Sequence, residues 1–574
     1  MKQITDRLPA GRARQAQEEA PAVSGLGAPF PDGASKFAKP GKRGGSNQLS
    51  TADHRHTPPE IHFPAAYNAA HDLIERNLEA GRSDKIAFVD DLGTYTYGDL
   101  AERVNRFASA LIDLGLRREE RVLLCLHDTI DFPTAFLGSI KAGIIPIAVN
   151  TLLTAGDYDY MLRDSRARAL IVSAPLLQTI APVLAKQRDL SNIIVSKGDH
   201  GSHLSFDALL DGRTSTFAAA PTCPDDVCFW LYSSGSTGPP KGTIHVHGSL
   251  IQTAELYARA VLGLREDDTV FSAAKLFFAY GLGNALTFPL SVGATTILMA
   301  ERPTPAAISK RLVDHRPTIF YAVPTLYAAM LVSADLPAKE KTHLRLCVSA
   351  GEALPENIGK RWTAHFGVEV LDGIGSTEML HIFLSNRPGN VRYGTTGVPV
   401  PGYGLRVVDD KMQPVAQGEV GDLYISGPTA ANGYWNNRTK TRATFQGEWV
   451  KSGDKYRVDA DGNYVYAGRS DDMLKVSGIY VSPVEVEAAL ITHPAVLEAA
   501  VVGREDEDKL TKPVAYVVLK PGQSASNPLC DELRAHVKSV LAPYKYPRWI
   551  EFIDELPKTA TGKIQRFKLR ARQN

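Results

Sequence analysis

Short apolar runs alternate with helical segments along most of the chain, and this order constrains the fold more than any other feature. A run that is apolar at nearly every position fits a strand buried on both faces, as in parallel sheets covered by helices. We therefore predict an α/β fold of helix-covered, mainly parallel sheets, with sites at the C-terminal ends of the strands. The clearest runs are RVLLCL (121–126), IIPIAV (144–149), TTILMA (295–300), TIFYAV (318–323), LRLCVSA (344–350) and VEVLDGIG (368–375).

The chain divides into three parts by composition. Residues 1–58 have few large apolar side chains and many Gly, Pro, Ser and Ala, so we expect a disordered extension. A targeting peptide is the alternative there, although acidic residues interrupt the basic ones. Residues 59–468 hold the alternating pattern and become rich in strands and turns from about residue 400. We expect 469–574 to form a small α+β domain.

The composition excludes several classes of partner. The 574 residues include 64 Lys+Arg and 63 Asp+Glu, and a net charge of +1 gives no reason to expect nucleic acid or an anionic membrane. No apolar run approaches the roughly 18 residues that cross a bilayer. The 5 cysteines form no CxxC pair, which indicates reduced thiols in a cytoplasmic protein.

The stretch LYSSGSTGPPKG (231–242) is typical of a phosphate-binding loop, because glycines let backbone N–H groups approach phosphate oxygens. It is not a P-loop of the GxxxxGK[ST] type, since Gly242 stands where a magnesium-binding hydroxyl is required. Lys241 suits a point charge beside the phosphates. A polar surface loop is the alternative when the stretch is taken alone. The hydroxyls that precede the lysine are Ser233, Ser234, Ser236 and Thr237.

Further motifs follow this loop in a fixed order, and together they resemble the adenylate-forming superfamily. That superfamily comprises acyl-CoA synthetases, peptide-synthetase adenylation domains and firefly-type luciferases. The resemblance extends over about residues 60–570. Its motifs are SSGSTGPPKG (233–242), DGIGSTEM (372–379), GEVGDLYISGP (418–428), KSGD (451–454), YAGRSDDMLKVSGIYVSPVEVE (466–487) and LPKTATGKIQR (556–566).

The resemblance implies a two-step reaction with ATP, Mg²⁺ and coenzyme A. A carboxylate attacks the α-phosphate of ATP to give acyl-AMP and pyrophosphate, and a thiol then displaces AMP. Lys563 is expected to stabilise charge at the α-phosphate, and Glu378 with Thr237 to hold Mg²⁺. Asp454 is expected to accept the ribose hydroxyls, supported by Arg469.

The resemblance also implies two domains that alternate between the half-reactions. Residues 59–468 would bind ATP and the acid, and 469–574 would swing about a hinge at Asp471. In the second orientation Lys475 and Gly478 would replace Lys563 and form the thiol tunnel. Coenzyme A contacts are expected at Gly478, Tyr544, Lys545 and Tyr546, although a plain domain surface is the alternative there. The remaining nucleotide contacts implied are Gly235, Gly238, Gly351, Glu352, Ala353, Asp372, Gly373, Ile374, Gly375, Ser376 and Thr377.

Two segments, AKLFFAYGLGN (274–284) and DGIGSTEMLHIFLSN (372–386), are expected to build the acid pocket. They resemble those of benzoate–CoA ligases and their hydroxybenzoate-accepting relatives, since aromatic walls with glycines suit a planar ring. Either Tyr280 or His381 is expected to bond a ring substituent or the carboxylate. Core packing is the alternative for these segments. The pocket residues implied are Phe278, Ala279, Tyr280, Gly281, Ala350, Gly351, Gly373, Gly375, Leu380, His381 and Lys563.

Several functions stay open at this point. The leading hypothesis is an ATP-dependent benzoate–CoA or hydroxybenzoate–CoA ligase. Alternatives are a ligase for 2-aminobenzoate or for a cyclic or medium-chain acid, an adenylation enzyme loading a free carrier protein, and an inactive binding homologue. A homodimer and acetylation and deacetylation of Lys563 are further possibilities. We expect removal of residues 1–58 to leave turnover unchanged.

Overall fold

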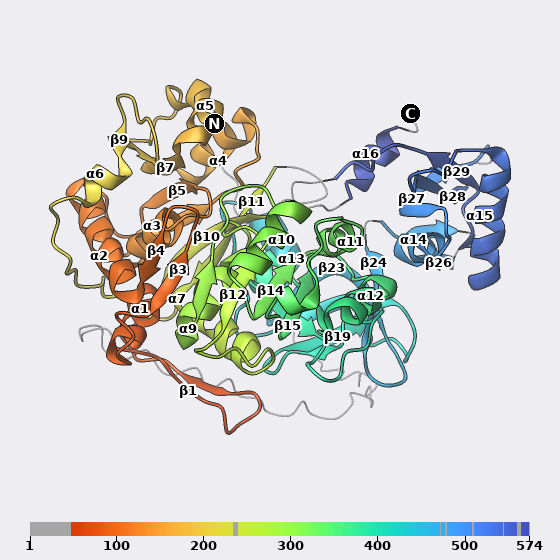
Figure 1. The fold of residues 1–574 in the computed structure, drawn as a ribbon, viewed down its shortest axis with the longest axis horizontal. Helices are drawn as coiled ribbons and strands as arrows, with labels where there is room; N and C mark the ends of the chain where they lie inside the picture. The colour runs from red at the N-terminus through yellow and green to blue at the C-terminus, as the bar shows by residue number, and fades with distance from the viewer. Residues whose placement is uncertain are drawn as a thin grey trace, which may run out of the picture. The chain divides into compact units, whose positions relative to one another are not determined.

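The computed structural model describes residues 48–233, 239–470, 472–476, 479–507, 510–542, 545–558 and 564–572. The predicted α/β class is confirmed, and each apolar run quoted above contains a strand (Figure 1). No helix in these ranges is long and apolar enough to cross a membrane.

The first large sheet has 8 strands and contains the two strands that flank the glycine-rich stretch in sequence. Strands β10 to β9 run parallel, whereas β11 and β21 add an antiparallel edge. The glycine-rich stretch begins at Ser233, the last residue of β10, and ends at Gly242 in β11. In spatial order the strands are β21 (Gly433–Tyr434), β11 (Lys241–Val246), β10 (Val227–Ser233), β6 (Ile145–Ala148), β5 (Arg121–Cys125), β7 (Ala169–Ser173), β8 (Asn192–Ser196) and β9 (Leu204–Ser205).

The second large sheet has 9 strands and is parallel through its centre, from β16 to β3. Antiparallel pairs close both ends. The predicted mainly parallel sheets are therefore confirmed. In spatial order the strands are β18 (Val398–Pro399), β17 (Ile382–Ser385), β16 (Val370–Gly375), β15 (Leu346–Ala350), β14 (Ile319–Ala322), β12 (Thr269–Ser272), β13 (Thr295–Ile297), β3 (Ile86–Val89) and β4 (Thr94–Thr96).

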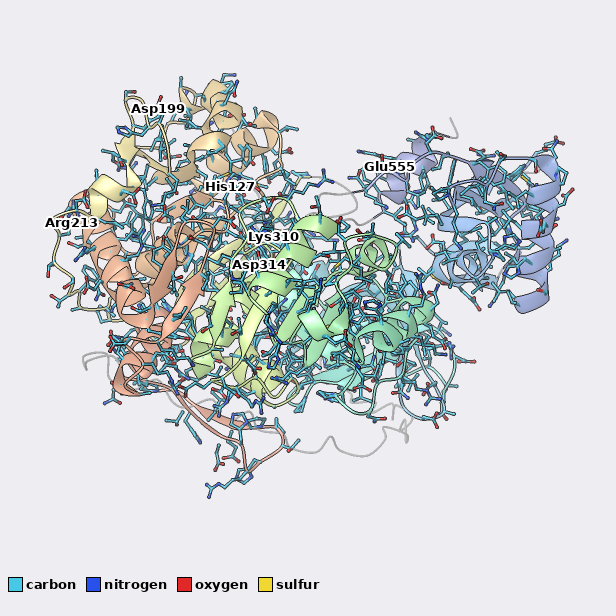
Figure 2. The ribbon with its side chains drawn as sticks, viewed as in Figure 1. His127, Asp199, Arg213, Lys310, Asp314 and Glu555 are labelled. Carbon is cyan, nitrogen blue, oxygen red and sulfur yellow. The ribbon has the colours of Figure 1, made fainter. Side chains whose placement is uncertain are left out.

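Most of the longer helices that cover these sheets bury one apolar face, whereas α3 is buried at every position. Helix α10 buries Ile308 and Leu312 and exposes Lys310 and Asp314, which form an ion pair on its outer face (Figure 2). The helices before the C-terminal part are α1 (Ala69–Glu79), α2 (Tyr97–Asp113), α3 (Asp131–Lys141), α4 (Ala155–Ser165), α5 (Ala174–Leu184), α6 (Phe206–Leu210), α7 (His247–Thr253), α8 (Ala279–Leu282), α9 (Phe288–Val292), α10 (Pro305–Asp314), α11 (Pro324–Leu331), α12 (Glu356–Phe366) and α13 (Arg438–Thr444). Two π-helices, η1 (Ala254–Arg259) and η2 (Gly283–Thr287), and two 3₁₀ turns, η3 (Lys339–Lys341) and η4 (Thr377–Met379), complete this set.

A third sheet is formed by the strand-rich sequence after residue 400. It contains β19 (Gly404–Val408), β20 (Gly421–Ser426), β22 (Phe445–Gln446), β23 (Trp449–Val458) and β24 (Tyr464–Arg469). Its strands are paired antiparallel, and β23 carries the KSGD motif opposite Arg469.

The C-terminal part has its own apolar core and α+β composition. In it, buried Glu487 accepts hydrogen bonds of 2.7 and 2.9 Å from Nη2 of Arg566. Its elements are β25 (Leu474–Val476), β26 (Ile479–Val481), α14 (Pro483–Ile491), β27 (Val496–Glu505), β28 (Thr511–Leu519), α15 (Asn527–Val540), β29 (Trp549–Phe552) and α16 (Arg566–Ala571).

The predicted disorder of residues 1–58 is wrong for residues 48–58. Strand β1 (Thr51–Asp53) pairs antiparallel with β2 (Glu60–His62). Ser50 is buried, and its hydroxyl donates to Oδ2 of Asp72 at 2.6 Å. Backbone pairing and buried hydrogen bonds order this polar segment, whereas composition reports only apolar content. Residues 1–47 lie outside the described residues.

Candidate functional site

The two large sheets bring two predicted motifs into contact. Ser233 ends β10, and Glu378 lies in the η4 turn that follows β16. The Ser233 hydroxyl donates to Oε1 of Glu378 at 3.3 Å. The first residue of the predicted phosphate-binding stretch and the segment predicted to bind magnesium therefore meet at the C-terminal ends of strands, as α/β architecture predicts.

Tyr434 fixes the carboxylate of Glu378, although the sequence did not single it out. Its hydroxyl donates to Oε1 of Glu378 at 2.7 Å, and the Nζ of Lys241 lies 4.8 Å from the centre of its ring. Burial, together with the charge of Glu378, raises the pKa of Tyr434, so the hydroxyl keeps its proton. Pairing of β21 with β11 places Tyr434 opposite Thr243 and thereby beside Lys241, the lysine of the glycine-rich stretch.

His245 supports the same turn from strand β11. Its Nε2 lies 2.8 Å from the carbonyl oxygen of Thr377, the residue before Glu378, so Nε2 carries the proton and donates. The ring is fully buried and stacks on Phe229 with centroids 5.2 Å apart. Burial lowers the pKa of His245 to about 4, which keeps the ring neutral. No periodic pattern in the sequence pointed to this residue.

The predicted ribose pair is brought together. Nη1 of Arg469 donates to Oδ1 of Asp454 at 2.9 Å, across the pairing of β23 with β24. Gly453 has a φ of +77°, and a Cβ there would lie 2.9 Å from Nη2 of Arg469. Glycine in KSGD therefore leaves room for the arginine beside the buried Asp454.

The predicted adenine frame lies at the ends of the adjacent strands β15 and β16. Ser349 pairs with Asp372, and Ala350 pairs with Gly373. Burial raises the pKa of Asp372 well above its ordinary value, and its Oδ1 has no hydrogen-bond partner among the described residues. A buried carboxyl in this state can donate to or accept from a bound base. The neighbouring residues at these strand ends are Gly351, Glu352 and Ala353 after β15, and Ile374, Gly375, Ser376 and Thr377 in or after β16.

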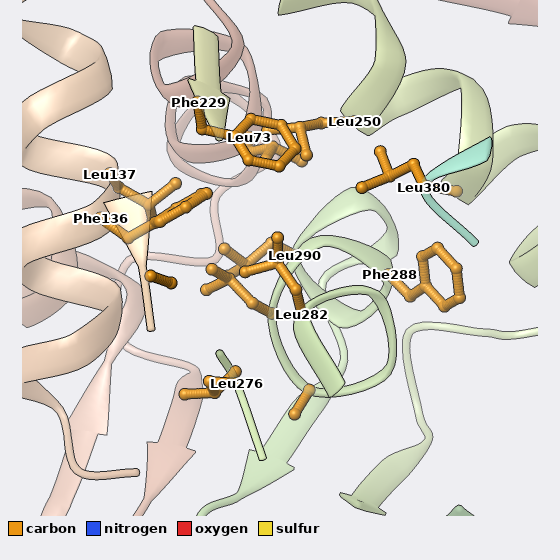
Figure 3. Packing of buried hydrophobic residues seen from close by; sticks show 14 of the residues in the cluster. Leu73, Phe136, Leu137, Phe229, Leu250, Leu276, Leu282, Phe288, Leu290 and Leu380 are labelled. Atoms are coloured by element: carbon orange, nitrogen blue, oxygen red, sulfur yellow. The ribbon is translucent and has the colours of Figure 1, made fainter. Parts of the chain in front are cut away.

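The two predicted acid-pocket segments also lie together. The ring of His381 is 2% exposed, and its centroid is 5.7 Å from that of Tyr280 and 4.5 Å from that of Phe288. Its Nε2 lies 3.3 Å from the backbone carbonyl oxygen of Tyr280. Burial lowers the pKa of His381 to about 3, so the pocket wall is neutral. Leu282, Phe288 and Leu380 continue this wall into a large apolar core (Figure 3).

Tyr280 and His381 differ in which of their polar atoms remain without a hydrogen-bond partner in the described part of the chain. The Tyr280 hydroxyl donates to the carbonyl oxygen of Val348 at 3.1 Å, so its proton is already used within the protein. Nε2 of His381 is likewise engaged, whereas its Nδ1 has no partner among the described residues. The ring of His381 therefore keeps an unpaired nitrogen acceptor, and Tyr280 has no further proton to donate.

Glycines allow the close packing around this histidine. A Cβ on Gly283 would lie 2.4 Å from Cδ2 of His381, and one on Gly281 would lie 2.0 Å from the carbonyl oxygen of Lys275. A Cβ on Gly375 would lie 2.5 Å from the carbonyl oxygen of His381. These distances are too short for any side chain, so the glycines of both segments are required by contact. The other predicted wall residues, Phe278, Ala279 and Ala350, are half-buried or buried in the same core.

Tyr257 is a pocket neighbour that the sequence did not indicate. It lies in the π-helix η1, fully buried, and its ring centroid is 5.6 Å from that of His381. A π-helix shifts the register of side chains by one position, and sequence periodicity does not reveal it.

The remaining predicted residues are described only in part. Nζ of Lys545 donates to both carboxylate oxygens of Glu485 at 2.7 Å, and the ring of Tyr546 lies 4.0 Å from Nζ of Lys538. These contacts neither place nor exclude coenzyme A, so that patch stays a prediction. The predicted site residues that lie outside the described residues are Ser234, Gly235, Ser236, Thr237, Gly238, Asp471, Gly478, Tyr544 and Lys563, together with the side chain of Lys475.

The donor set around Glu378 fits Mg²⁺ as a bridge to phosphates. The described part of the chain contains no group of three or more His, Cys, Asp or Glu that could hold a metal alone. Glu378 offers one carboxylate, whose Oε1 is fixed by Tyr434 and Ser233. Mg²⁺ in phosphate-transfer sites takes one or two carboxylates and completes its shell with phosphate oxygens and water.

Comparison with known proteins identifies the class. The model of the AMP-binding enzyme family matches residues 74–435, and that of the AMP-binding enzyme C-terminal domain matches residues 485–563. The chain belongs to this family, which confirms the resemblance to adenylate-forming enzymes.

Its relatives include aryl–CoA ligases. The chain is 65% identical over 525 residues to the benzoate–CoA ligase of Thauera aromatica, covering 91% of this chain and 99% of the relative. It is 51% identical over 508 residues to the 4-hydroxybenzoate–CoA/benzoate–CoA ligase of Rhodopseudomonas palustris, covering 88% of this chain and 94% of the relative. A solved structure of a benzoate CoA ligase from Burkholderia xenovorans LB400 has a TM-score of 0.83 and 59% identity, covering 88% of this chain and all of that one (100%). The predicted resemblance to benzoate–CoA ligases is thus confirmed.

Proposed function

We propose that this chain is an AMP-forming aryl–CoA ligase that joins benzoate to coenzyme A with ATP. The carrying observation is that one segment, residues 372–381, holds both the carboxylate beside the phosphate loop and the neutral histidine of an aromatic pocket. Such an arrangement brings a planar carboxylic acid to a nucleotide. The names of the relatives support the same substrate class.

In the first half-reaction a benzoate oxygen attacks the α-phosphorus of ATP, the bond to the β-phosphate breaks, and pyrophosphate leaves. Tyr434 and Ser233 keep Glu378 in one orientation. With Thr237, that glutamate would hold Mg²⁺, which supplies positive charge to the phosphates when bound. Lys241 adds a fixed positive charge near the loop, and burial lowers the pKa of this lysine from its ordinary value.

In the second half-reaction the coenzyme A thiolate attacks the benzoyl carbonyl, and the bond to AMP breaks. We propose that Lys563 serves the first step and the face around Lys475 and Gly478 the second, with Asp471 as hinge. A Lys563→Ala variant should lose adenylation of benzoate yet convert supplied benzoyl-AMP to the thioester. Equal loss of both half-reactions would contradict domain alternation. The same lysine is our proposed target for acetylation, because acetylation removes its charge.

Unsubstituted benzoate is our preferred substrate. The hydroxyl proton of Tyr280 and Nε2 of His381 are engaged by backbone carbonyls, so neither donates to a ring substituent, and Nδ1 of His381 is the nitrogen of this pair that is left to accept from a ring hydroxyl. A mainly apolar pocket rejects an added hydroxyl by about 10²-fold, whereas a pocket built to bond the hydroxyl rejects its absence by about 10⁴-fold. The ratio of the two substrates therefore distinguishes the cases.

The test is AMP release with Mg-ATP and coenzyme A, with benzoate, 4-hydroxybenzoate, 2-aminobenzoate and hexanoate in parallel. We expect benzoate to lead and hexanoate to be inactive. Faster turnover of hexanoate would overturn the substrate but keep the enzyme class. Replacing coenzyme A by a carrier protein tests the loading alternative, and absence of pyrophosphate release with any acid would indicate an inactive homologue.

The proposal includes a cytoplasmic location. All 5 cysteines are free, and burial raises the pKa of each thiol, so all five fit reduced, weakly reactive thiols. We leave the homodimer as a prediction for size-exclusion chromatography with light scattering.

A further inference from the structure

Residues 48–62 form a segment, here called the N-terminal arm, that is fastened to the fold at two points. At the first, Ser50 donates to Asp72 of α1 at 2.6 Å. At the second, Nε2 of His54 lies 2.6 Å from Oε2 of Glu255 in η1. The arm thus connects the first helix of the fold to a π-helix about 200 residues later in the sequence.

Glu255 is a carboxylate that requires its partners. It is 2% exposed, and a carboxylate withdrawn from water is costly unless charges and hydrogen bonds compensate it. Arg259 donates to its Oε2 at 2.9 Å, and Nη1 of Arg76 lies 3.8 Å from its Oε1. The contact to His54 is the shortest of the three and the one supplied by the arm.

The other side of the same π-helix faces the acid pocket. Tyr257 stands two positions after Glu255, and side chains two apart on a helix point in different directions. Tyr257 lies 5.6 Å from His381 and 6.2 Å from Phe288 between ring centroids, and its hydroxyl is 3.4 Å from Oγ of Ser385. A rotation of η1 that follows loss of the Glu255 anchor therefore moves a ring that touches His381.

We infer that His54 is a positioning residue for the acid pocket, acting through Glu255 and Tyr257. This inference rests on the proposed function for the location of the acid pocket. The arm contributes no atom to the chemistry. Its hydrogen bond holds η1 in the rotation that packs Tyr257 against His381, and so sets the affinity for the aromatic acid.

The experiment compares single variants of the full chain, measuring KM for benzoate, KM for Mg-ATP, kcat and Tm. We expect His54→Ala to raise KM for benzoate about threefold to tenfold, as the loss of a hydrogen bond to a charged group permits, with KM for Mg-ATP unchanged. His54→Gln keeps a donor to Glu255 and should restore much of the affinity. The matched control is Arg55→Ala, whose side chain is 86% exposed and pairs within the arm to Asp53.

A second variant separates positioning from stability. Ser50→Ala removes the hydrogen bond to Asp72 of α1 and leaves that of His54 to Glu255. It also removes an acceptor of Arg76, but two hydrogen bonds to Oδ1 of Asp72 keep that arginine in place near Glu255. We therefore expect Ser50→Ala to lower Tm and keep KM for benzoate. If His54→Ala behaves like Ser50→Ala, or raises KM for both substrates equally, the arm is merely structural and the inference is overturned.

Failure of the proposed function gives a different result. If wild-type enzyme prefers another acid, the substrate assignment falls, and the same variants are compared with that acid. If wild-type enzyme releases no pyrophosphate with any acid, equilibrium binding of benzoate by calorimetry replaces KM. A benzoate affinity equal in wild type and His54→Ala, or no benzoate binding at all, then overturns the inference.

Discussion

Removal of one hydroxyl, in Tyr434→Phe, tests whether the orientation of Glu378 matters for ATP. The lost bond is the 2.7 Å contact to Oε1, which leaves that oxygen, among the described residues, the 3.3 Å contact from Ser233. A hydrogen bond to a charged group contributes about 1.5–3 kcal/mol. Since about 1.4 kcal/mol is a tenfold change in an equilibrium constant, the upper range is about 10²-fold.

Part of this energy is lost equally in the free enzyme, so we expect a smaller effect on binding. KM for Mg-ATP should rise about tenfold, while KM for benzoate changes less than about twofold, because the acid wall does not touch Tyr434. The assay is pyrophosphate release with each substrate varied in turn. The matched control is Tyr97→Phe. It removes a buried hydroxyl that donates to the carbonyl oxygen of Ala294 at 2.7 Å and has no hydrogen bond to Glu378 within the described residues. If the two variants lower Tm alike and both leave KM for Mg-ATP unchanged, the hydroxyl of Tyr434 is only structural and the reasoning fails.

Three further predictions follow from burial and packing. Gly283→Ala places a methyl 2.4 Å from Cδ2 of His381, and such an overlap in a packed core costs about 1–3 kcal/mol. KM for benzoate should therefore rise about tenfold, while KM for Mg-ATP stays constant. An unchanged KM for benzoate would show that the His381 ring moves aside without cost. Burial lowers the pKa of His245 and His247 to about 4 and that of His381 to about 3, so between about pH 6 and 5 the unfolded chain binds about three more protons at these positions, which lowers stability by up to about 4 kcal/mol per pH unit as pH falls. Burial also raises the pKa of Asp128 to about 6 and that of Asp372 well above its ordinary value, so the folded chain binds more protons at these carboxyls and offsets part of the slope. In urea titrations His381→Gln should make the slope shallower by about 1.4 kcal/mol per pH unit, and an unchanged slope would refute the pKa shift. Glu487→Gln weakens the buried ion pair with Arg566 of α16 and should lower the free energy of unfolding of the C-terminal part by about 3 kcal/mol in chemical denaturation. A loss below about 1 kcal/mol would show that the ion pair contributes little net stability.

The fold class was predictable because buried parallel strands must be apolar along their length. RVLLCL and LRLCVSA, for example, contain β5 and β15, both buried at nearly every position. The order of strands within each sheet was not predictable, since it depends on pairs such as β21 with β11, whose residues are far apart in the chain.

The candidate site was predictable to the extent that its residues stand in motifs. Glu378, Asp454 and His381 were identified in this way, and the structure surrounds each with partners that explain its position. Tyr434 and Tyr257 were missed, because one reaches the site through a two-residue edge strand and the other through a π-helix. The arm was misjudged for a related reason: its order comes from hydrogen bonds to distant buried carboxylates rather than from apolar content.

The short distance along the chain between Glu378 and His381 has a consequence for changing the range of acids accepted. Only the end of η4 and Leu380, with a φ of +67°, separate them, and Gly375 packs against the backbone of His381 with no space for a Cβ. Any backbone adjustment that enlarges the histidine side of the pocket will also displace the glutamate. Directed evolution toward bulkier acids should therefore tolerate substitutions at Phe278–Tyr280 and select against those near 381, where new substrate scope is gained only at the expense of nucleotide affinity.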